Sequence, residues 1–187
     1  MSDWAPNLPI ETERLILRVH RMTDLDDLVL FHGDPEATRY IPWPVRTREQ
    51  TEEALAAKLT RDVARAAGDW LVLAIEERAT ATVIGEVLLK REHGGLAEVG
   101  YVIRVDRQGK GLASEAVRAM LVLGFHSYDR RAIDAMIVRG NDASVRLVER
   151  FGFVRETSLD EVAGDAVVEG YRLDAATWRA HETATST

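Results

Sequence analysis

A glycine-rich turn at residues 107–116, RQGKGLASEA, joins a segment that predicts a β-strand to one that predicts an amphipathic helix. The strand segment is LAEVGYVIRV at 96–105, and apolar residues recur at helical spacing after the turn. A further strand segment, AIDAMIV, follows at 132–138. A strand, a helix and another strand make a crossover connection, so residues 96–138 are expected to contribute parallel strands to one sheet.

The other segments predict antiparallel strands and further helices around this crossover. TVIGEVLLK at 82–90 is joined to the segment LAEVGYVIRV by the turn EHGG, which predicts an antiparallel hairpin. Asp24 is expected to cap a short helix, and Thr47 with Gln50 to open a long helix that ends at Gly68. These elements predict an α+β, or mixed α/β, fold. The remaining elements are strands at 13–19 and 70–77, a helix at 141–153 and a final hairpin around the turn AGD at 163–165.

Composition narrows the class of protein. The length of 187 residues fits one domain, and 46% hydrophobic with 29% charged residues is ordinary for a folded soluble protein. No apolar run approaches the roughly 20 residues needed to span a bilayer, and the first residues lack the pattern of a signal peptide. The absence of cysteine excludes disulfides and a thiolate nucleophile, and the net charge of -7 argues against a nucleic-acid partner. A cytoplasmic protein without membrane or nucleic-acid partners is therefore expected.

Three interpretations of the glycine turn are open from its residues. It can be a plain connection in which glycine supplies positive φ angles. It can hold a phosphate, because the first N–H groups of a helix are unpaired and the helix dipole favours negative charge there. It can belong to a dinucleotide-binding oxidoreductase domain, but G-x-G-x-x-G is only half met, by Gly109 and Gly111, with Ser114 in place of the third glycine. The P-loop pattern is absent, and only one crossover unit is visible, which disfavours the dinucleotide interpretation.

The residues from Gln108 to Ala113, QGKGLA, match the pattern Q/R-x-x-G-x-G/A, and other segments accompany this match in order. On these motifs the chain resembles the GNAT superfamily of acyl-CoA transferases, and within it the branch of the ribosomal-protein N-terminal acetyltransferases. The resemblance runs from about residue 11 to residue 178. The accompanying segments are TERLILR at 12–18, DPEATRY at 34–40, AEVGYVI at 97–103 and NDASVRLVERFGF at 141–153.

The resemblance implies one acetyltransferase domain over residues 1–187, with a core at about 11–178 and acetyl-CoA as co-substrate. Its central sheet is expected to be mixed and mostly antiparallel, with about six to seven strands that splay at the acetyl-CoA site and helices at its sides. Backbone groups of the strand would pair with the pantetheine arm, and N–H groups of the turn would hold the pyrophosphate. The cofactor-binding residues that the resemblance implies are Val102, Ile103, Val105, Gln108, Gly109, Lys110, Gly111, Leu112, Ala113, Ser114, Asn141 and Ser144.

The resemblance also implies direct attack of an amine on the thioester, which needs a polarised carbonyl, a proton donor and a base. The backbone N–H of Ile103 is the candidate for polarising the carbonyl. Many family members carry a proton-donating tyrosine seven residues after the asparagine, but Val148 stands there, so Ser144 is the candidate donor. Glu98 and Glu86, on adjacent predicted strands, are the candidate bases, although strand glutamates usually face solvent.

The sequence restricts the acceptor less than the donor. Tyr40 and Trp43, in RYIPWP at 39–44, are expected to lie on a loop over the acceptor site. Trp43 can equally pack into the core beside this loop. The expected acceptor is a primary amine of a protein N-terminus or of a small molecule, with a non-catalytic acyl-CoA sensor as the alternative. A homodimer is left open. The five histidines lack HxH and HExxH spacing, so no metal is expected.

Overall fold

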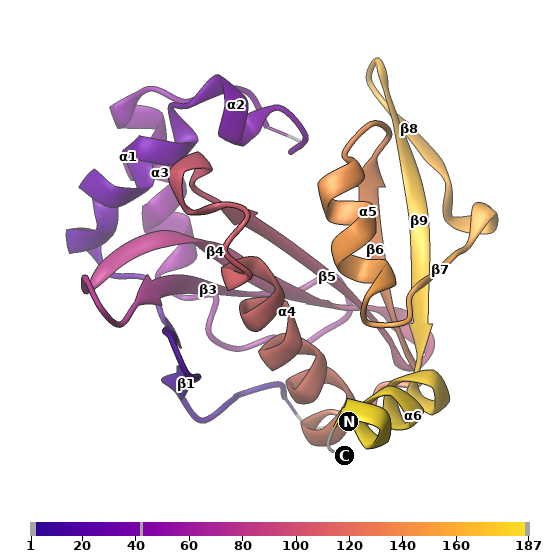
Figure 1. The fold of residues 1–187 in the computed structure, drawn as a ribbon. Helices are drawn as coiled ribbons and strands as arrows, with labels where there is room; N and C mark the ends of the chain where they lie inside the picture. Colours follow the sequence, from indigo (N-terminus) through magenta and orange to yellow (C-terminus); the bar gives the residue numbers. More distant parts are fainter. Residues whose placement is uncertain (1–2, 42, 186–187) are drawn as a thin grey trace.

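The computed structural model describes residues 3–41 and 43–185, which form one open sheet with helices at its sides (Figure 1). Its strands are β1 (Ile10–Glu11), β2 (Leu15–Arg18), β3 (Trp70–Glu77), β4 (Thr82–Arg91), β5 (Leu96–Ile103), β6 (Ala132–Val138), β7 (Val154–Arg155), β8 (Glu161–Ala163) and β9 (Ala166–Asp174). The order across the sheet is β1-β2-β3-β4-β5-β6-β9-β7, and β8 pairs with β9 outside this path. Every pairing in it is antiparallel except that of β5 with β6.

The helices divide between the two faces of the sheet. Their bounds are α1 (Leu25–His32), α2 (Pro35–Thr38), α3 (Arg48–Lys58), α4 (Leu112–Val122), α5 (Asp142–Glu149) and α6 (Ala175–Thr185). One apolar cluster joins α1 and α3 to one face, through Leu28, Leu55 and Val102. The larger cluster joins α4 to the opposite face, and includes Val117 and Leu89. We call these the α3 face and the α4 face.

The expected α+β class and the mostly antiparallel sheet are confirmed. Strands β3 and β6 have the bounds that the sequence predicts, because each consists mainly of apolar residues that are buried in the sheet. The described residues form more strands than the six to seven expected. The expected first arm of the final hairpin, FVRETSL at 153–159, forms only the short strand β7, and β8 pairs with β9 around the turn instead. β1 and β8 are the additional strands, with two and three residues, too short for alternation to show in a sequence.

Helix α3 is shorter than expected, since it ends at Lys58 and not at Gly68. Beyond it, the N–H and carbonyl of Ala64 form two hydrogen bonds with the backbone of Trp4, of 3.0 and 2.9 Å. This pairing with a segment far away in the sequence satisfies backbone groups that a longer helix would have satisfied. The apolar residues after Lys58 therefore pack without being helical.

The two expected helix caps have different outcomes. Thr47 and Gln50 form the predicted capping box of α3, with hydrogen bonds of 3.3 and 2.9 Å. Asp24 precedes α1, but its side chain does not cap that helix. Its carboxylate instead accepts from Arg18 and from the Arg21 N–H, at 2.8 to 2.9 Å. A buried arginine is thus the stronger partner for this carboxylate.

Strands β5 and β6 separate soon after they begin. They pair over three positions, ending with Glu98 opposite Asp134, whereas β6 pairs with β9 along its whole length. Figure 1 shows the two strands diverging, with α5 beside β6. The edge of β5 from Val99 to Ile103 is therefore left without a neighbouring strand.

Candidate functional site

A cleft of about 840 Å³ lies where β5 and β6 diverge. Residues 99–102 of β5 and 134–138 of β6 line it, and so do Asn141 and Ser144 at the start of α5. It continues across β4 to the loop that carries Trp43. The cleft therefore runs through the sheet and has walls on both faces.

Cross-strand register divides the lining residues between the two faces. On the α3 face, the row nearest the start of β5 contains side chains from five strands. The next two rows on this face are shorter, and the middle one is apolar. The three rows are Trp70–Lys90–Glu98–Asp134–Arg172, Val72–Leu88–Gly100 and Ala74–Glu86–Val102. On the α4 face, Val99 and Tyr101 alternate with these residues.

The glycine turn leaves backbone donors free at the start of α4. Gly109 and Gly111 have φ angles of +71° and +77°, which favour glycine. Gly111 is the N-cap of α4, and none of the N–H groups of Gly109, Lys110 and Gly111 donates to another described residue. No atom lies within 4 Å of a Cβ built at Gly109. Free N–H groups at an open helix N-terminus can bind a phosphate.

Side chains from distant segments hold this turn, and the sequence analysis missed them. Arg14 donates to the Lys110 carbonyl at 2.9 Å and pairs with Glu115 of α4 at 2.7 Å. Arg150 donates to the Ser114 hydroxyl at 2.8 Å. Both arginines add positive charge beside the turn, and no local motif could have indicated either of them.

The free edge of β5 presents backbone groups of alternate residues to the cleft. The Arg104 N–H donates to the Ile84 carbonyl on β4 at 2.8 Å. Because antiparallel pairs alternate, Val102 turns its backbone groups to β4, whereas Ile103 turns its own to the cleft. The Ile103 carbonyl accepts from the Gln108 side chain at 3.1 Å, which agrees with this alternation.

Two other expected cofactor-binding residues differ from Ile103 in the position of their backbone. The backbone of Val102 is used in the ladder with β4, and only its side chain lines the cleft. Val105 lies in the 3-10 turn η3 (Val105–Arg107), beyond the end of the strand. Ile103 keeps the position that the sequence analysis expected for a backbone N–H facing the cleft.

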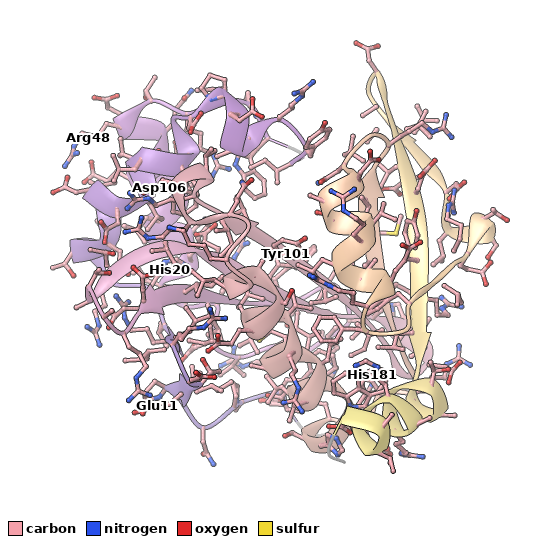
Figure 2. All side chains as sticks on the ribbon, in the orientation of Figure 1. Glu11, His20, Arg48, Tyr101, Asp106 and His181 are labelled. Atoms are coloured by element: carbon pink, nitrogen blue, oxygen red, sulfur yellow. The ribbon has the colours of Figure 1, made fainter. Side chains whose placement is uncertain are left out.

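A hydroxyl pair lies on the α4 face of the cleft. Tyr101, near the middle of the molecule in Figure 2, donates from its hydroxyl to Ser144 Oγ at 2.9 Å. The Asn141 side chain accepts from the Ser144 N–H at 3.2 Å, so Asn141 is the N-cap of α5. Burial raises the pKa of Tyr101 above its ordinary value, against a smaller opposite effect of Ser144. Tyr101 was missed, because only the strand register places it beside Ser144.

Glu98 lies at the last paired position before the strands diverge, and it lines the cleft. Burial raises the pKa of its carboxyl above the ordinary value, while Lys90, 3.7 Å away, lowers it. The nearby charges of Glu92, Glu161 and Asp134 raise it further. A partly buried carboxylate with a raised pKa is suited to accept a proton.

Glu86, the other candidate base, is 2% exposed and has cationic and imidazole neighbours. Lys58 Nζ lies 2.5 Å from its carboxylate, and the Nε2 atoms of His20 and His32 lie 3.2 and 3.4 Å from it. Burial alone would raise the pKa of Glu86, but Lys58 and the two histidines lower it below the ordinary value. A carboxylate in this setting is a weak proton acceptor, so the geometry disfavours Glu86 as the base.

Replacing Glu86 with glutamine is expected to lower the free energy of unfolding by about 3–5 kcal/mol, because Lys58 would remain buried without its partner. The lowered pKa of Glu86 means that its contribution is present above the ordinary value of 4.5 and is lost as pH falls towards the folded-state pKa. Urea unfolding across this pH range measures both effects. The double variant Glu86→Gln/Lys58→Met should recover most of the loss, and equal stability of Glu86→Gln and wild type would contradict the expectation.

The loop before α3 contributes an aromatic and cationic wall. Tyr40 and Trp43 both line the cleft, which agrees with one of their two interpretations. Arg46, which the sequence analysis missed, stacks on Trp43 with its guanidinium 4.9 Å from the ring centroid. The His32 ring lies edge-on to Trp43, with 6.2 Å between the ring centroids.

His20, His32, His126 and His181 contact carboxylates or aromatic rings, and no histidine belongs to a metal centre in the part of the chain that the structure describes. Within residues 3–41 and 43–185, no group of three or more His, Asp or Glu side chains is arranged to hold a metal ion. A search of the same residues finds no helix with the length and apolar character needed to cross a membrane.

The family model described as an acetyltransferase (GNAT) domain matches residues 14–154, which include the glycine turn, Glu98 and Ser144. The uncharacterized N-acetyltransferase p20 of Bacillus licheniformis is 30% identical over 149 residues, which cover 79% of this chain and 83% of that protein. The uncharacterized N-acetyltransferase YoaA of Bacillus subtilis strain 168 is 32% identical over 155 residues, which cover 80% of this chain and 85% of that protein.

Solved structures share this fold. The acetyltransferase (GNAT family) from Bacillus anthracis superposes with a TM-score of 0.77, at 24% identity over 90% of this chain and 99% of that chain. Spermidine N-acetyltransferase from Vibrio cholerae, in complex with CoA and spermine, superposes with a TM-score of 0.73, at 21% identity over 90% of this chain and 99% of that chain. A proposed ribosomal-protein-serine acetyltransferase from Vibrio cholerae superposes with a TM-score of 0.71, at 20% identity over 91% of this chain and 99% of that chain. At these identities the likeness is one of fold.

Proposed function

This chain belongs to the GNAT acetyltransferase family and is an N-acetyltransferase, and from this premise we propose how its residues transfer an acetyl group from acetyl-CoA to a primary amine. The observation that carries the proposal is the cleft between β5 and β6, which Glu98 lines, together with the free N–H groups of residues 109–111 in the turn that follows β5. One sheet runs through all the strands, so residues 1–187 are proposed to act as a single domain.

Backbone groups of this chain hold the acetyl-CoA in the proposal. The unpaired N–H groups of residues 109–111 suit the pyrophosphate, and Arg14, Lys110 and Arg150 add positive charge near it. The cleft-facing backbone of Ile103 suits the pantetheine arm. It does not suit the thioester carbonyl, because Glu98 lies five residues back along β5, on the order of 16 Å away. The bound thioester supplies an activated acetyl carbon, and no acyl-enzyme is required.

The transfer requires two proton movements. The acceptor nitrogen forms a bond with the acetyl carbon as the bond to sulfur breaks, so one proton leaves the amine and one reaches the sulfur. Glu98 is proposed to take the amine proton, because its raised pKa and its place at the divergence of the strands suit that task. Ser144, supported by the hydrogen bond from Tyr101, is proposed to donate towards the sulfur.

The proposal also concerns the chemical class of the acceptor. The motifs at 12–18, 34–40 and 141–153 resemble the ribosomal-protein N-terminal acetyltransferases, and a solved structure of that description shares the fold. A solved relative in fold, from Vibrio cholerae, binds spermine, a small amine. A protein N-terminus and a small primary amine therefore both belong to the proposed substrate class.

Release of free CoA under multiple turnover, stimulated by an amine, tests the function. Ser144→Ala is expected to lower kcat by about 100-fold and Tyr101→Phe by about tenfold, since both residues are proposed to act on proton transfer. Tyr128→Phe is the matched control: the Tyr128 hydroxyl has no hydrogen-bond partner among the described residues, and its ring stacks on Trp4 away from the cleft. CoA binding without turnover on any peptide or amine would favour the sensor interpretation.

A further inference from the structure

We infer that the acceptor amine carries an anionic group, a carboxylate or a phosphate, and that Arg46 binds this group together with the indole N–H of Trp43. The inference rests on the proposed function and names the substrate class of the same cleft. It comes from an uncompensated arginine, an unpaired buried donor and the spacing of both from Glu98.

Arg46 is a partly buried cation without a carboxylate partner. It lines the cleft, stacks on Trp43, and has its Nη1 3.5 Å from His32 Nδ1. No described carboxylate lies within ion-pair distance of it, unlike Arg18, which pairs with Asp24. Buried or partly buried charges are normally paired, so Arg46 has room for one anionic partner from outside the chain.

The neighbours of Arg46 do not neutralise its charge. The one carboxylate close by, Glu86, is held by Lys58 at 2.5 Å. Burial lowers the pKa of His20 to about 4 and also lowers the pKa of His32, so both rings are neutral near pH 7. Arg61 is a further cation in the lining of the cleft. This end of the cleft therefore has a net positive charge.

Trp43 supplies a second, independent observation. Its Nε1 atom is buried and has no hydrogen-bond partner among the described residues. An indole N–H can only donate, and a buried donor is nearly always paired with an acceptor. An oxygen of a carboxylate or phosphate placed beside Arg46 would accept from this N–H as well.

The distance to Glu98 defines the length of the acceptor. On β4, Glu86 lies in the Arg46 end of the cleft and Lys90 lies opposite Glu98, four residues further along. At about 3.3 Å per residue, the two ends are on the order of 13 Å apart. The floor between them is the apolar row Val72–Leu88–Gly100. An α-amino acid is too short for this span, and an amine joined to an anion by an apolar linker or a short peptide fits it.

The test compares ω-amino acids of increasing chain length with n-alkylamines and α,ω-diamines of the same lengths. Turnover is measured as kcat/KM, and binding to the CoA-loaded protein by calorimetry, which reads the anion contact without turnover. We expect an intermediate ω-amino acid to be preferred over the matched alkylamine by about tenfold to a hundredfold, as for a hydrogen bond to a charged group. ω-Aminoalkyl phosphates in the same series show which anion is preferred.

Arg46→Gln is expected to remove the preference and the length optimum, and Arg46→Lys to keep part of it. Arg48→Gln is the matched control, because Arg48 is exposed and pairs with Asp26 outside the cleft. The inference would be overturned if the wild type acetylated alkylamines as efficiently as ω-amino acids, or if Arg46→Gln kept the preference for ω-amino acids. Either result would leave the proposed function standing. Arg46-dependent binding of ω-amino acids without turnover of any amine would support the anion site and count against the transferase proposal.

Discussion

Replacing Gly111 with glutamate is expected to abolish CoA binding while the protein stays folded. Gly111 has a φ angle of +77° and caps α4, so a side chain there costs about 1–2 kcal/mol of backbone strain. The carboxylate would stand among the free N–H groups proposed for the pyrophosphate and repel it. We expect CoA affinity to fall by at least about 100-fold, because both the space and the local charge are lost.

Thermal unfolding with and without CoA measures this effect. For the wild type, CoA at about a hundred times its Kd adds roughly 2.7 kcal/mol, which raises Tm by about 5–10 °C for a chain of this length. Gly111→Glu should show no rise. Gly164→Glu is the matched control, because Gly164 has a φ angle of +61° in the open turn between β8 and β9. A full CoA response in Gly111→Glu would mean that the ligand binds elsewhere.

Replacing Glu98 with glutamine is expected to lower kcat by about 100-fold to 10,000-fold, the range for loss of a general base. The carboxylate must be deprotonated to accept the amine proton, so kcat/KM of the wild type should fall as pH drops through its raised pKa. Glutamine cannot titrate, so the variant should lose this dependence and keep only that of the amine substrate itself.

Glu92→Gln controls for the change in charge. Glu92 lies in the same cleft and pairs with Lys90 at 2.6 Å, so its removal alters the local field without removing the proposed base. Its kcat should stay within a few-fold of the wild type, as surface ion pairs contribute little. An unchanged pH profile in Glu98→Gln would show that another group, or water, takes the proton.

Local patterns were sufficient for much of the framework. The bounds of β3 and β6, the capping box at Thr47 and the glycine turn followed from runs of neighbouring residues. The end of helix α3 did not follow from local sequence, because the residues after Lys58 leave the helix and Ala64 pairs with the backbone of Trp4. Tertiary backbone pairing outweighed helix propensity there.

The site shows the same division at the level of single side chains. Glu86 and Glu98 lie on adjacent strands and on the same face of the sheet. The residues that flank them in the sequence therefore do not show which of the two can act as a base. The structure separates them, because Lys58 reaches Glu86 from α3 and leaves Glu98 at the divergence of β5 and β6. Tyr101 likewise became a candidate only through the register that sets it beside Ser144.

The sequence by itself determined that a glycine turn opens a helix after a strand, and so which segment of this chain suits a pyrophosphate. That site is made of backbone groups within a few residues, and local sequence decides their conformation. Only the tertiary structure decided which carboxylate has a raised pKa, which hydroxyls form a hydrogen bond, and that Arg46 lies beside Trp43 without a carboxylate partner. These properties depend on charges and burial contributed by distant segments, and the fold alone brings those segments together.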